Sequence, residues 1–123
     1  MLDKYKKTVG AAGEGAAAKY LRKKRYRIID RNFYIRGGEL DIIAEKGGTT
    51  VFIEVKTRTS VEYGTPAESV TYHKVQRMKK AAEFYMMQNG LCYARFDVIE
   101  VYARVEGGKI RVEKLNHIEN AFM

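Results

Sequence analysis

The sequence predicts an α/β fold, in which a single domain holds a mixed β-sheet flanked by helices. Two observations lead to this fold class. Apolar residues alternate with polar ones in several short segments, which is the period of a strand, and other segments repeat with the helical period. One helical segment precedes three consecutive strand-like segments, and a second separates the third strand from the fourth. The 123 residues suffice for one core of two or three layers and are too few for two.

The first helix is expected from Gly10 to Lys24, where alanines and Leu21 form a small apolar face. Basic residues gather at its carboxyl end, where the helix dipole favours cations. The polar residues 1–7 are expected to be frayed or only loosely helical. Each glycine in a helix costs about 1 kcal/mol relative to alanine. We therefore expect a packing or ligand-approach reason for the three glycines in its first half, Gly10, Gly13 and Gly15.

Three strands follow as an antiparallel meander. Tyr26 to Ile35 forms the first strand, and Gly38 to Arg58 forms a hairpin of two alternating runs joined at Gly47-Gly48. One face of this hairpin is apolar, and the opposite face carries charge. A turn centred on the two glycines fixes the register, in which the facing pairs are Lys46 with Thr49, Ala44 with Val51, Asp41 with Glu54 and Glu39 with Lys56.

A loop that ends at Pro66 leads to the second helix, expected from Thr71 to Gln88, with Thr71 as its cap and Asn89-Gly90 as its end. The fourth strand is expected from Ala94 to Tyr102 and the fifth from Ile110 to Leu115. Because a helix lies between strands three and four, a right-handed crossover allows these strands to pair in parallel. The buried face of the second helix is expected to consist of Val75, Met78, Ala82, Tyr85 and Met86.

The charged hairpin has the parts of a phosphodiester hydrolase. Two carboxylates, Asp41 and Glu54, face each other at roughly 5 Å and repel unless a cation lies between them. Mg²⁺ takes such oxygen ligands together with water and phosphate oxygens. Lys56 follows on the same face, where an ammonium group can hold a phosphate or the attacking water. The alternative is a solvated hairpin face with a Glu39–Lys56 surface ion pair, and the pattern by itself leaves both interpretations open.

The composition indicates which binding partners and which cell compartment to expect. Lys and Arg number 23 against 15 Asp and Glu, and this net charge of +8 favours polyanions, nucleic acid first, although it also serves solubility. The single cysteine, Cys92, excludes a disulfide framework and a cysteine-based zinc site, and it fits a reducing cytoplasm. His73 and His117 lack ligand spacing and are expected at the surface or at helix ends. No apolar run reaches membrane-spanning length, so we expect a cytoplasmic protein with no membrane partner.

Asp41, followed after twelve residues by Glu54-Val55-Lys56, resembles the signature of the PD-(D/E)XK, or restriction-endonuclease-like, nuclease superfamily. A larger set of residues, spread over nearly the whole chain, closely resembles the YraN-type family of small bacterial proteins. One departure is Arg25, since that family usually has glycine just before the tyrosine found here at position 26. The set comprises Gly13-Glu14, Ala16, Ala17, Tyr20-Leu21, Arg31-Asn32, Gly38-Glu39-Leu40-Asp41, the run from Val51 to Arg58, Tyr63-Gly64-Thr65-Pro66, Lys74 and Arg95-Phe96-Asp97-Val98.

The resemblance implies a restriction-endonuclease-like fold with an αβββαβ core, similar to archaeal Holliday-junction resolvases. It further implies a Mg²⁺- or Mn²⁺-dependent endonuclease that selects branched or otherwise structured DNA. Asp41, Glu54 and Lys56 are then the catalytic residues. The metal ligands are Asp41, Glu54, the Val55 carbonyl and Glu14, which corresponds to the glutamate on the first helix of the resolvases.

Contacts to nucleic acid are expected from Lys74, Arg58, Tyr63 and Arg77. Lys74 lies near a helix N-terminus, which attracts phosphate, and Tyr63 lies in a loop from which it can stack on a base or sugar. The competing interpretation is an adaptor or nucleic-acid-binding module that keeps the nuclease fold without hydrolysis. The sequence leaves open the choice between DNA and RNA, and between a monomer and a homodimer.

Overall fold

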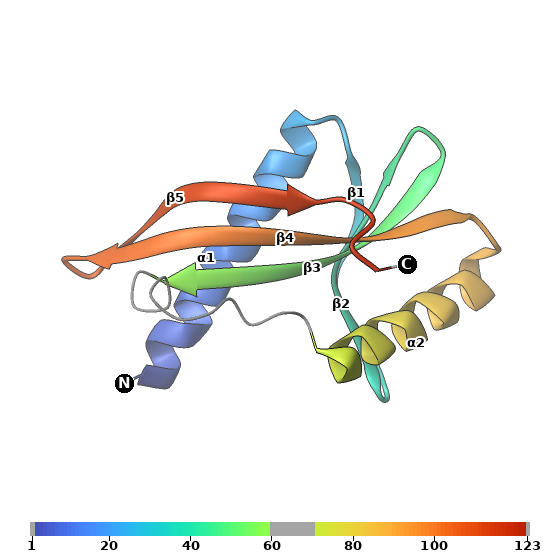
Figure 1. Ribbon diagram of the computed structural model, residues 1–123, viewed down its shortest axis with the longest axis horizontal. Coiled ribbons are helices and arrows are strands. Elements are labelled where there is room, and N and C mark those ends of the chain that lie inside the picture. Colours follow the sequence, from blue (N-terminus) through green and yellow to red (C-terminus); the bar gives the residue numbers. More distant parts are fainter. Residues whose placement is uncertain (1, 60–70, 123) are drawn as a thin grey trace.

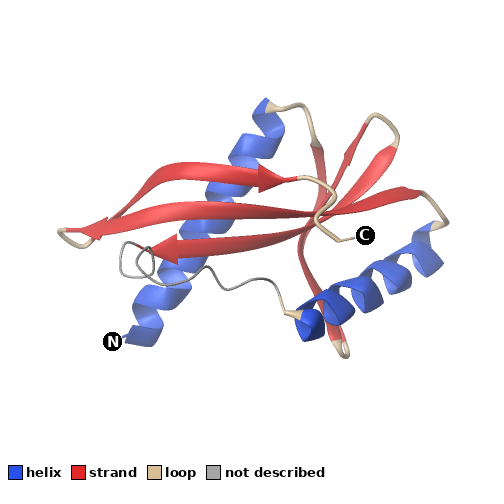
Figure 2. Cartoon of the chain, in the orientation of Figure 1, coloured by secondary structure: helices blue, strands red, loops and turns tan. Residues whose placement is uncertain are grey.

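A computed structural model of the chain describes residues 2–59 and 71–122. Within this part, two helices flank a sheet of five strands (Figures 1 and 2). The predicted α/β class with a mixed sheet is confirmed, and the arrangement is consistent with a restriction-endonuclease-like fold. The elements are α1 (Leu2–Lys23), β1 (Arg27–Ile35), β2 (Gly38–Lys46), β3 (Thr49–Thr59), α2 (Tyr72–Asn89), β4 (Tyr93–Glu106) and β5 (Lys109–Ile118).

The strands lie in the sheet in chain order. β1, β2 and β3 form the expected antiparallel meander, β3 and β4 pair in parallel across α2, and β4 and β5 form an antiparallel hairpin. The predicted register of the central hairpin is confirmed where β2 and β3 are paired, because Lys46 faces Thr49 and Ala44 faces Val51. This pairing ends at Ile42 and Ile53, so the next residues on the two strands are Asp41 and Glu54.

The two helices cover opposite faces of the sheet (Figure 2). On β3, Val51 and Ile53 pack in the cluster that contains α1, whereas the intervening Phe52 packs in the cluster that contains Met78 of α2. β2 likewise contributes to both clusters. The expected apolar hairpin face therefore forms, except that Leu40 packs on the other side, and the opposite, charged face also buries Ile43 and Phe52. The crossover through α2 closes the second face, which the meander alone would leave to solvent.

Helix α1 begins at Leu2, well before the expected Gly10, and the reason for one of its glycines is steric. A Cβ atom on Gly13 would lie 2.9 Å from Thr57 Cβ and closer still to the Thr57 hydroxyl. Gly10 and Gly15 have nothing within 4 Å of such an atom. The expected packing reason therefore applies to Gly13, where α1 lies directly against β3.

The carboxyl end of α1 explains the departure at position 25. Arg25 has a left-handed backbone with φ of 69°, and the amides of Arg25 and Tyr26 donate to the carbonyls of Arg22 and Leu21. This is the Schellman arrangement that usually ends a helix at a glycine. The turn is thus retained with arginine in place of glycine, at the conformational cost of a left-handed non-glycine residue.

The second helix forms as expected from its caps. The Thr71 side chain accepts a hydrogen bond from the Lys74 amide, and the Gly90 amide donates to Met86. Met78 and Ala82 are fully buried, as is Ala81. None of the described helices is both long and apolar enough to cross a membrane.

Candidate active site

Asp41 and Glu54 come together where the β2–β3 ladder ends. The Val55 amide donates a hydrogen bond of 2.8 Å to Asp41 Oδ2, which fixes the carboxylate beside β3. Glu54 is only 7% exposed. The interpretation of this hairpin face as a solvated surface is therefore wrong at Glu54, whose carboxylate lies 3.5 Å from Lys74 of α2.

The surroundings of this acidic pair favour protonation. Burial raises the pKa of Glu54 to about 8, and the negative charge of Asp41 adds to the rise. Burial also raises the pKa of Asp41, although the hydrogen bond from Val55 opposes this rise. At neutral pH the two carboxyls thus tend to hold one proton between them unless another cation compensates their charge.

Helix α1 brings a third carboxyl toward the pair. Burial raises the pKa of Glu14, the charge of Asp41 raises it further, and Arg31 and Asn32 oppose the rise. Because Gly13 lets α1 pack closely on β3, the following residue is carried toward Asp41. The predicted approach of the first-helix glutamate to the acidic pair agrees with this electrostatic proximity, while its role as a ligand stays a prediction.

Two of these carboxylates have an oxygen without a partner. Glu14 Oε1 and Glu54 Oε2 are buried and accept no hydrogen bond from the residues that the structure describes, although buried polar atoms are almost always satisfied. Hard divalent cations take such oxygens as ligands, so the donor chemistry fits Mg²⁺ or Mn²⁺. Among the residues described, no group of three or more acidic, histidine or cysteine side chains converges closely enough to hold a metal. Water and substrate phosphate would have to complete the coordination, as is usual for Mg²⁺.

Two cations from α2 reach the site from the other side. Lys74 Nζ bonds the Glu39 carboxylate and lies 3.5 Å from Glu54 Oε1, and Arg77 Nε lies 3.9 Å from Glu39 Oε1. The sequence placed Glu39 opposite Lys56, but its carboxylate pairs with α2. Gly38 permits this approach, because a Cβ atom there would lie 2.8 Å from the Arg77 carbonyl oxygen.

The other predicted site residues have different surroundings. Lys56 is half-buried on β3, two residues beyond Glu54. Arg58 is buried, and its Nε donates to Glu100 Oε2 at 3.2 Å, so the guanidinium is already engaged within the sheet. Tyr63 lies outside the described residues. The catalytic role of Lys56 and the nucleic-acid contacts of Arg58, Lys74, Arg77 and Tyr63 stay predictions.

Strand β1 contributes residues that the sequence analysis did not place at the site. Tyr34 faces Glu39 across the β1–β2 ladder, and its hydroxyl donates to Asn32 Oδ1 at 3.3 Å. Arg31 and Asn32 both act on the Glu14 carboxyl. The meander predicted that β1 borders β2. Counting back from a two-residue Arg36-Gly37 turn pairs Ile35 with Gly38 and Tyr34 with Glu39, which is the observed register.

Comparison with known proteins identifies the family of this chain. Residues 13–101 match the model of the family described as "Uncharacterised protein family UPF0102". The chain belongs to the UPF0102 family. It is 50% identical over 119 residues to a UPF0102 protein of Caldanaerobacter subterraneus, an alignment that covers 95% of this chain and 96% of that one. The expected YraN-type relationship is confirmed.

Further UPF0102 relatives align over nearly their full length. The chain is 47% identical to a protein of Syntrophomonas wolfei, with 93% of this chain and 96% of that one covered. It is 45% identical to a protein of Geobacter sulfurreducens, with 96% and 91% covered. The matched residues 13–101 include the acidic pair, Glu14 and Lys74.

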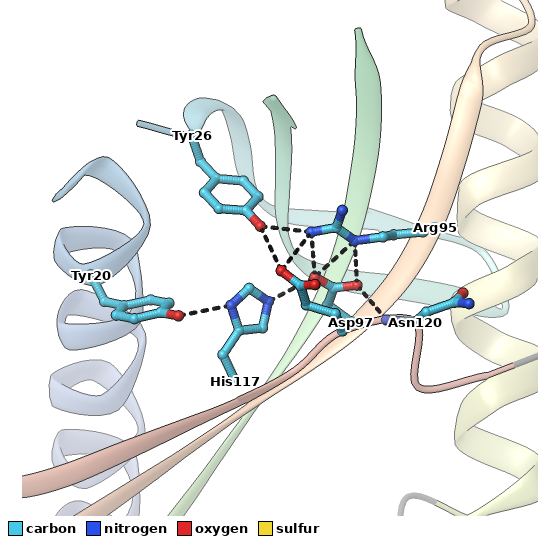
Figure 3. A network of polar contacts seen from close by, with 7 residues as sticks. Tyr20, Tyr26, Arg95, Asp97, His117 and Asn120 are labelled. Carbon is cyan, nitrogen blue, oxygen red and sulfur yellow. Dashed lines mark hydrogen bonds and ion pairs between the residues drawn. The ribbon is translucent and has the colours of Figure 1, made fainter. Parts of the chain in front are cut away.

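This UPF0102 chain also holds a buried polar network that the sequence did not reveal (Figure 3). Asp97 is completely buried and accepts hydrogen bonds from Arg95 at 3.0 Å and from the Asn120 amide at 3.0 Å. His117 Nε2 lies 2.7 Å from Asp97 Oδ2, and the Tyr20 hydroxyl lies 3.0 Å from His117 Nδ1. The network thus ties the end of α1 to β4 and β5.

The expected surface position of His117 is wrong, since its side chain is 7% exposed. Burial alone would raise the pKa of Asp97, but the hydrogen bonds from His117, Arg95 and the Asn120 amide hold it below its usual range. The hydrogen-bond partners of Asp97 lie 20 or more residues away in sequence, except Arg95, which is on the same strand. Alternation along β4 does place Asp97 with the apolar Ile99 and Val101, which is the signal that was available.

Proposed function

We propose that the protein is a Mg²⁺- or Mn²⁺-dependent endonuclease that hydrolyses phosphodiester bonds in branched or otherwise structured DNA. One observation carries this proposal above the others: Glu54 Oε2 is buried beside Asp41 and has no hydrogen-bond partner within residues 2–59 and 71–122. A buried carboxylate oxygen left unsatisfied costs about 1–3 kcal/mol or more, which a bound cation would recover. The net charge of +8 supports a polyanionic substrate.

In this proposal each residue has a separate role. Asp41 and Glu54 hold the ion, with Glu14 and the Val55 carbonyl as further ligands. When bound, the ion polarises the phosphate and stabilises the leaving oxygen. Lys56, beyond Glu54 on β3, orients the attacking water or the phosphate. Lys74 and Arg77 lie on the α2 side of the site, close to the Glu39 carboxylate. When substrate binds, they contact its phosphate in place of Glu39, and these charge-assisted contacts contribute to affinity.

The competing function is a nucleic-acid-binding or adaptor module without hydrolysis. Lys74 favours it, because its ammonium group bonds Glu39 and lies 3.5 Å from Glu54 Oε1. An internal cation thus already compensates part of the acidic charge that a metal would otherwise balance. Binding without cleavage is the outcome that separates this module from the nuclease.

The test is cleavage of a panel of branched, single-stranded and duplex DNA with Mg²⁺, with Mn²⁺ and with chelator. Metal-dependent cleavage, strongest on branched DNA, is expected. Lys56→Ala should leave binding nearly intact while cleavage falls by a factor on the order of 10² to 10⁴, the range for loss of a group that assists proton transfer. Lys109→Ala is the matched control, since that lysine is exposed at the start of β5.

Binding should fall steeply with salt even in chelator, because phosphate neutralisation releases counterions. Salt-dependent binding with no cleavage under any metal would select the binding module. An active Lys56→Ala protein would remove that residue from the catalytic set, and salt-independent binding would remove nucleic acid as the ligand.

A further inference from the structure

An exposed aromatic ring stands beside the acidic pair. Tyr34 faces Glu39 across the β1–β2 ladder, and Glu39 precedes Asp41 by two residues on the same strand. The Tyr34 side chain is 64% exposed, although neighbouring strand residues such as Phe33 pack into the core. Tyrosine at a strand position bordering a charged site places a flat apolar face where a ligand would approach.

The ring is held in place from its own strand. Its hydroxyl donates to Asn32 Oδ1 at 3.3 Å, and Asn32 has a left-handed backbone with φ of 56°. Asparagine tolerates this conformation better than most residues, and such positions concentrate at functional sites. Asn32 also acts on Glu14, so one side chain connects the exposed ring with the acidic site. An exposed tyrosine with a fixed orientation loses little freedom when a ligand stacks on it.

The charges around the ring select what can lie on it. Partial desolvation raises the pKa of the Tyr34 hydroxyl, the charges of Asp41, Glu14 and Glu39 raise it further, and Lys74 opposes the rise. A phosphate directly on the ring would be repelled by three acidic groups. An uncharged base would not be. Its neighbouring phosphate would then lie toward the acidic pair, where Lys74 and, when bound, a divalent cation offset the carboxylate charge.

A base inside a duplex is stacked on both sides and offers no free face. Bases at flaps, ends and branch points are unstacked and are bound on aromatic side chains. We propose that Tyr34 is a stacking platform for an unpaired base next to the cleaved phosphate, so that the protein selects nucleic acid with unpaired bases. This inference rests on the proposed function for the nature of the ligand, and it adds the residue that recognises structure.

The experiment measures binding in chelator, so that cleavage plays no part. Wild type, Tyr34→Ala and Tyr34→Phe are titrated with a duplex carrying a single-stranded flap and with the matched uninterrupted duplex. Tyr34→Ala should weaken flap binding roughly 5- to 150-fold, the range for one lost base stack, and should change duplex binding less than about twofold. Tyr34→Phe, which keeps the ring and loses the hydrogen bond to Asn32, should remain within about threefold of wild type on the flap.

Tyr93→Ala is the matched control, since that tyrosine is 83% exposed on β4 opposite Thr49, at the other end of the hairpin. It should bind both DNAs as wild type does. A 2-aminopurine base in the flap reports stacking directly, and its fluorescence should be quenched by wild type and Tyr34→Phe but not by Tyr34→Ala. Circular dichroism and thermal unfolding verify that each variant is folded.

Two outcomes overturn the inference in different ways. If wild type prefers the flap and Tyr34→Ala keeps that preference, or Tyr93→Ala loses it equally, Tyr34 is not the platform and the proposed function stands. If wild type binds neither DNA, the proposed function fails and the inference fails with it. The inference is supported if Tyr34→Ala alone loses affinity for the flap, keeps its affinity for the duplex and fails to quench the 2-aminopurine fluorescence.

Discussion

Replacing Glu54 by glutamine tests whether the acidic pair is a strained, cation-seeking site. The folded pKa of Glu54 is raised from 4.5 to about 8, chiefly by burial and then by Asp41. Between these two values the folded protein binds a proton that the unfolded chain does not. The stability contributed by protonated Glu54 is therefore present below pH 4.5 and is lost as pH rises through about 8. Glutamine has no proton to lose, so Glu54→Gln should escape this loss.

The magnitude follows from the same shift. At about 1.4 kcal/mol for each pKa unit, a rise from 4.5 to about 8 sets an upper limit on the order of 5 kcal/mol. The gain of Glu54→Gln over wild type should grow with pH across this window, by at most about 1.4 kcal/mol per pH unit. Both proteins contain the same histidines, whose titration cancels in the difference between them.

Urea unfolding at intervals from pH 5 to pH 9, in chelator, measures that difference. Glu83→Gln, on the exposed face of α2, carries the same charge change and should run parallel to wild type. A Glu54→Gln difference that stays constant over the whole pH range would refute the reasoning from burial.

The same proteins with excess Mg²⁺ or Mn²⁺ test the ligand role. At 100 times its dissociation constant, an ion bound only by the folded state adds about 2.7 kcal/mol to the free energy of unfolding. Wild type and Glu83→Gln should gain this increment near pH 8, and Glu54→Gln should forfeit most of it. Equal shifts in all three proteins would exclude Glu54 as a ligand.

Two further predictions concern helix α1. Gly13→Ala should lower the free energy of unfolding by about 1–3 kcal/mol, because its Cβ atom would collide with Thr57, while the control Gly15→Ala should raise it by up to about 1 kcal/mol through helix propensity. Denaturant unfolding of both variants decides the matter, and a stabilised Gly13→Ala protein would contradict the close approach of α1 to β3. Arg25→Gly should raise stability by about 1 kcal/mol by relieving the left-handed backbone, which thermal unfolding measures, and a loss of stability would show that the arginine side chain matters more than its backbone.

The sequence by itself determined the elements and the register of the central hairpin. Strand period and the Gly47-Gly48 turn are local properties, and in a hairpin the turn sets the register. That register placed Asp41 and Glu54 at the end of the β2–β3 ladder, one residue beyond the last pair. The caps of α2 and the parallel pairing of β3 with β4 followed from equally local signals and from the handedness of crossovers.

Only the tertiary structure decided which charges meet. Glu39 is paired with Lys74 and not with Lys56, because α2 packs against Gly38 and brings its own cations to the site. The sequence predicted a surface position for His117, but the β4–β5 hairpin places its ring against Asp97. Ion pairs and buried networks join residues distant in sequence, and no periodicity encodes their partner. Burial likewise depends on what covers a strand, so the sequence could name Glu54 but could not show that its carboxyl lies away from water.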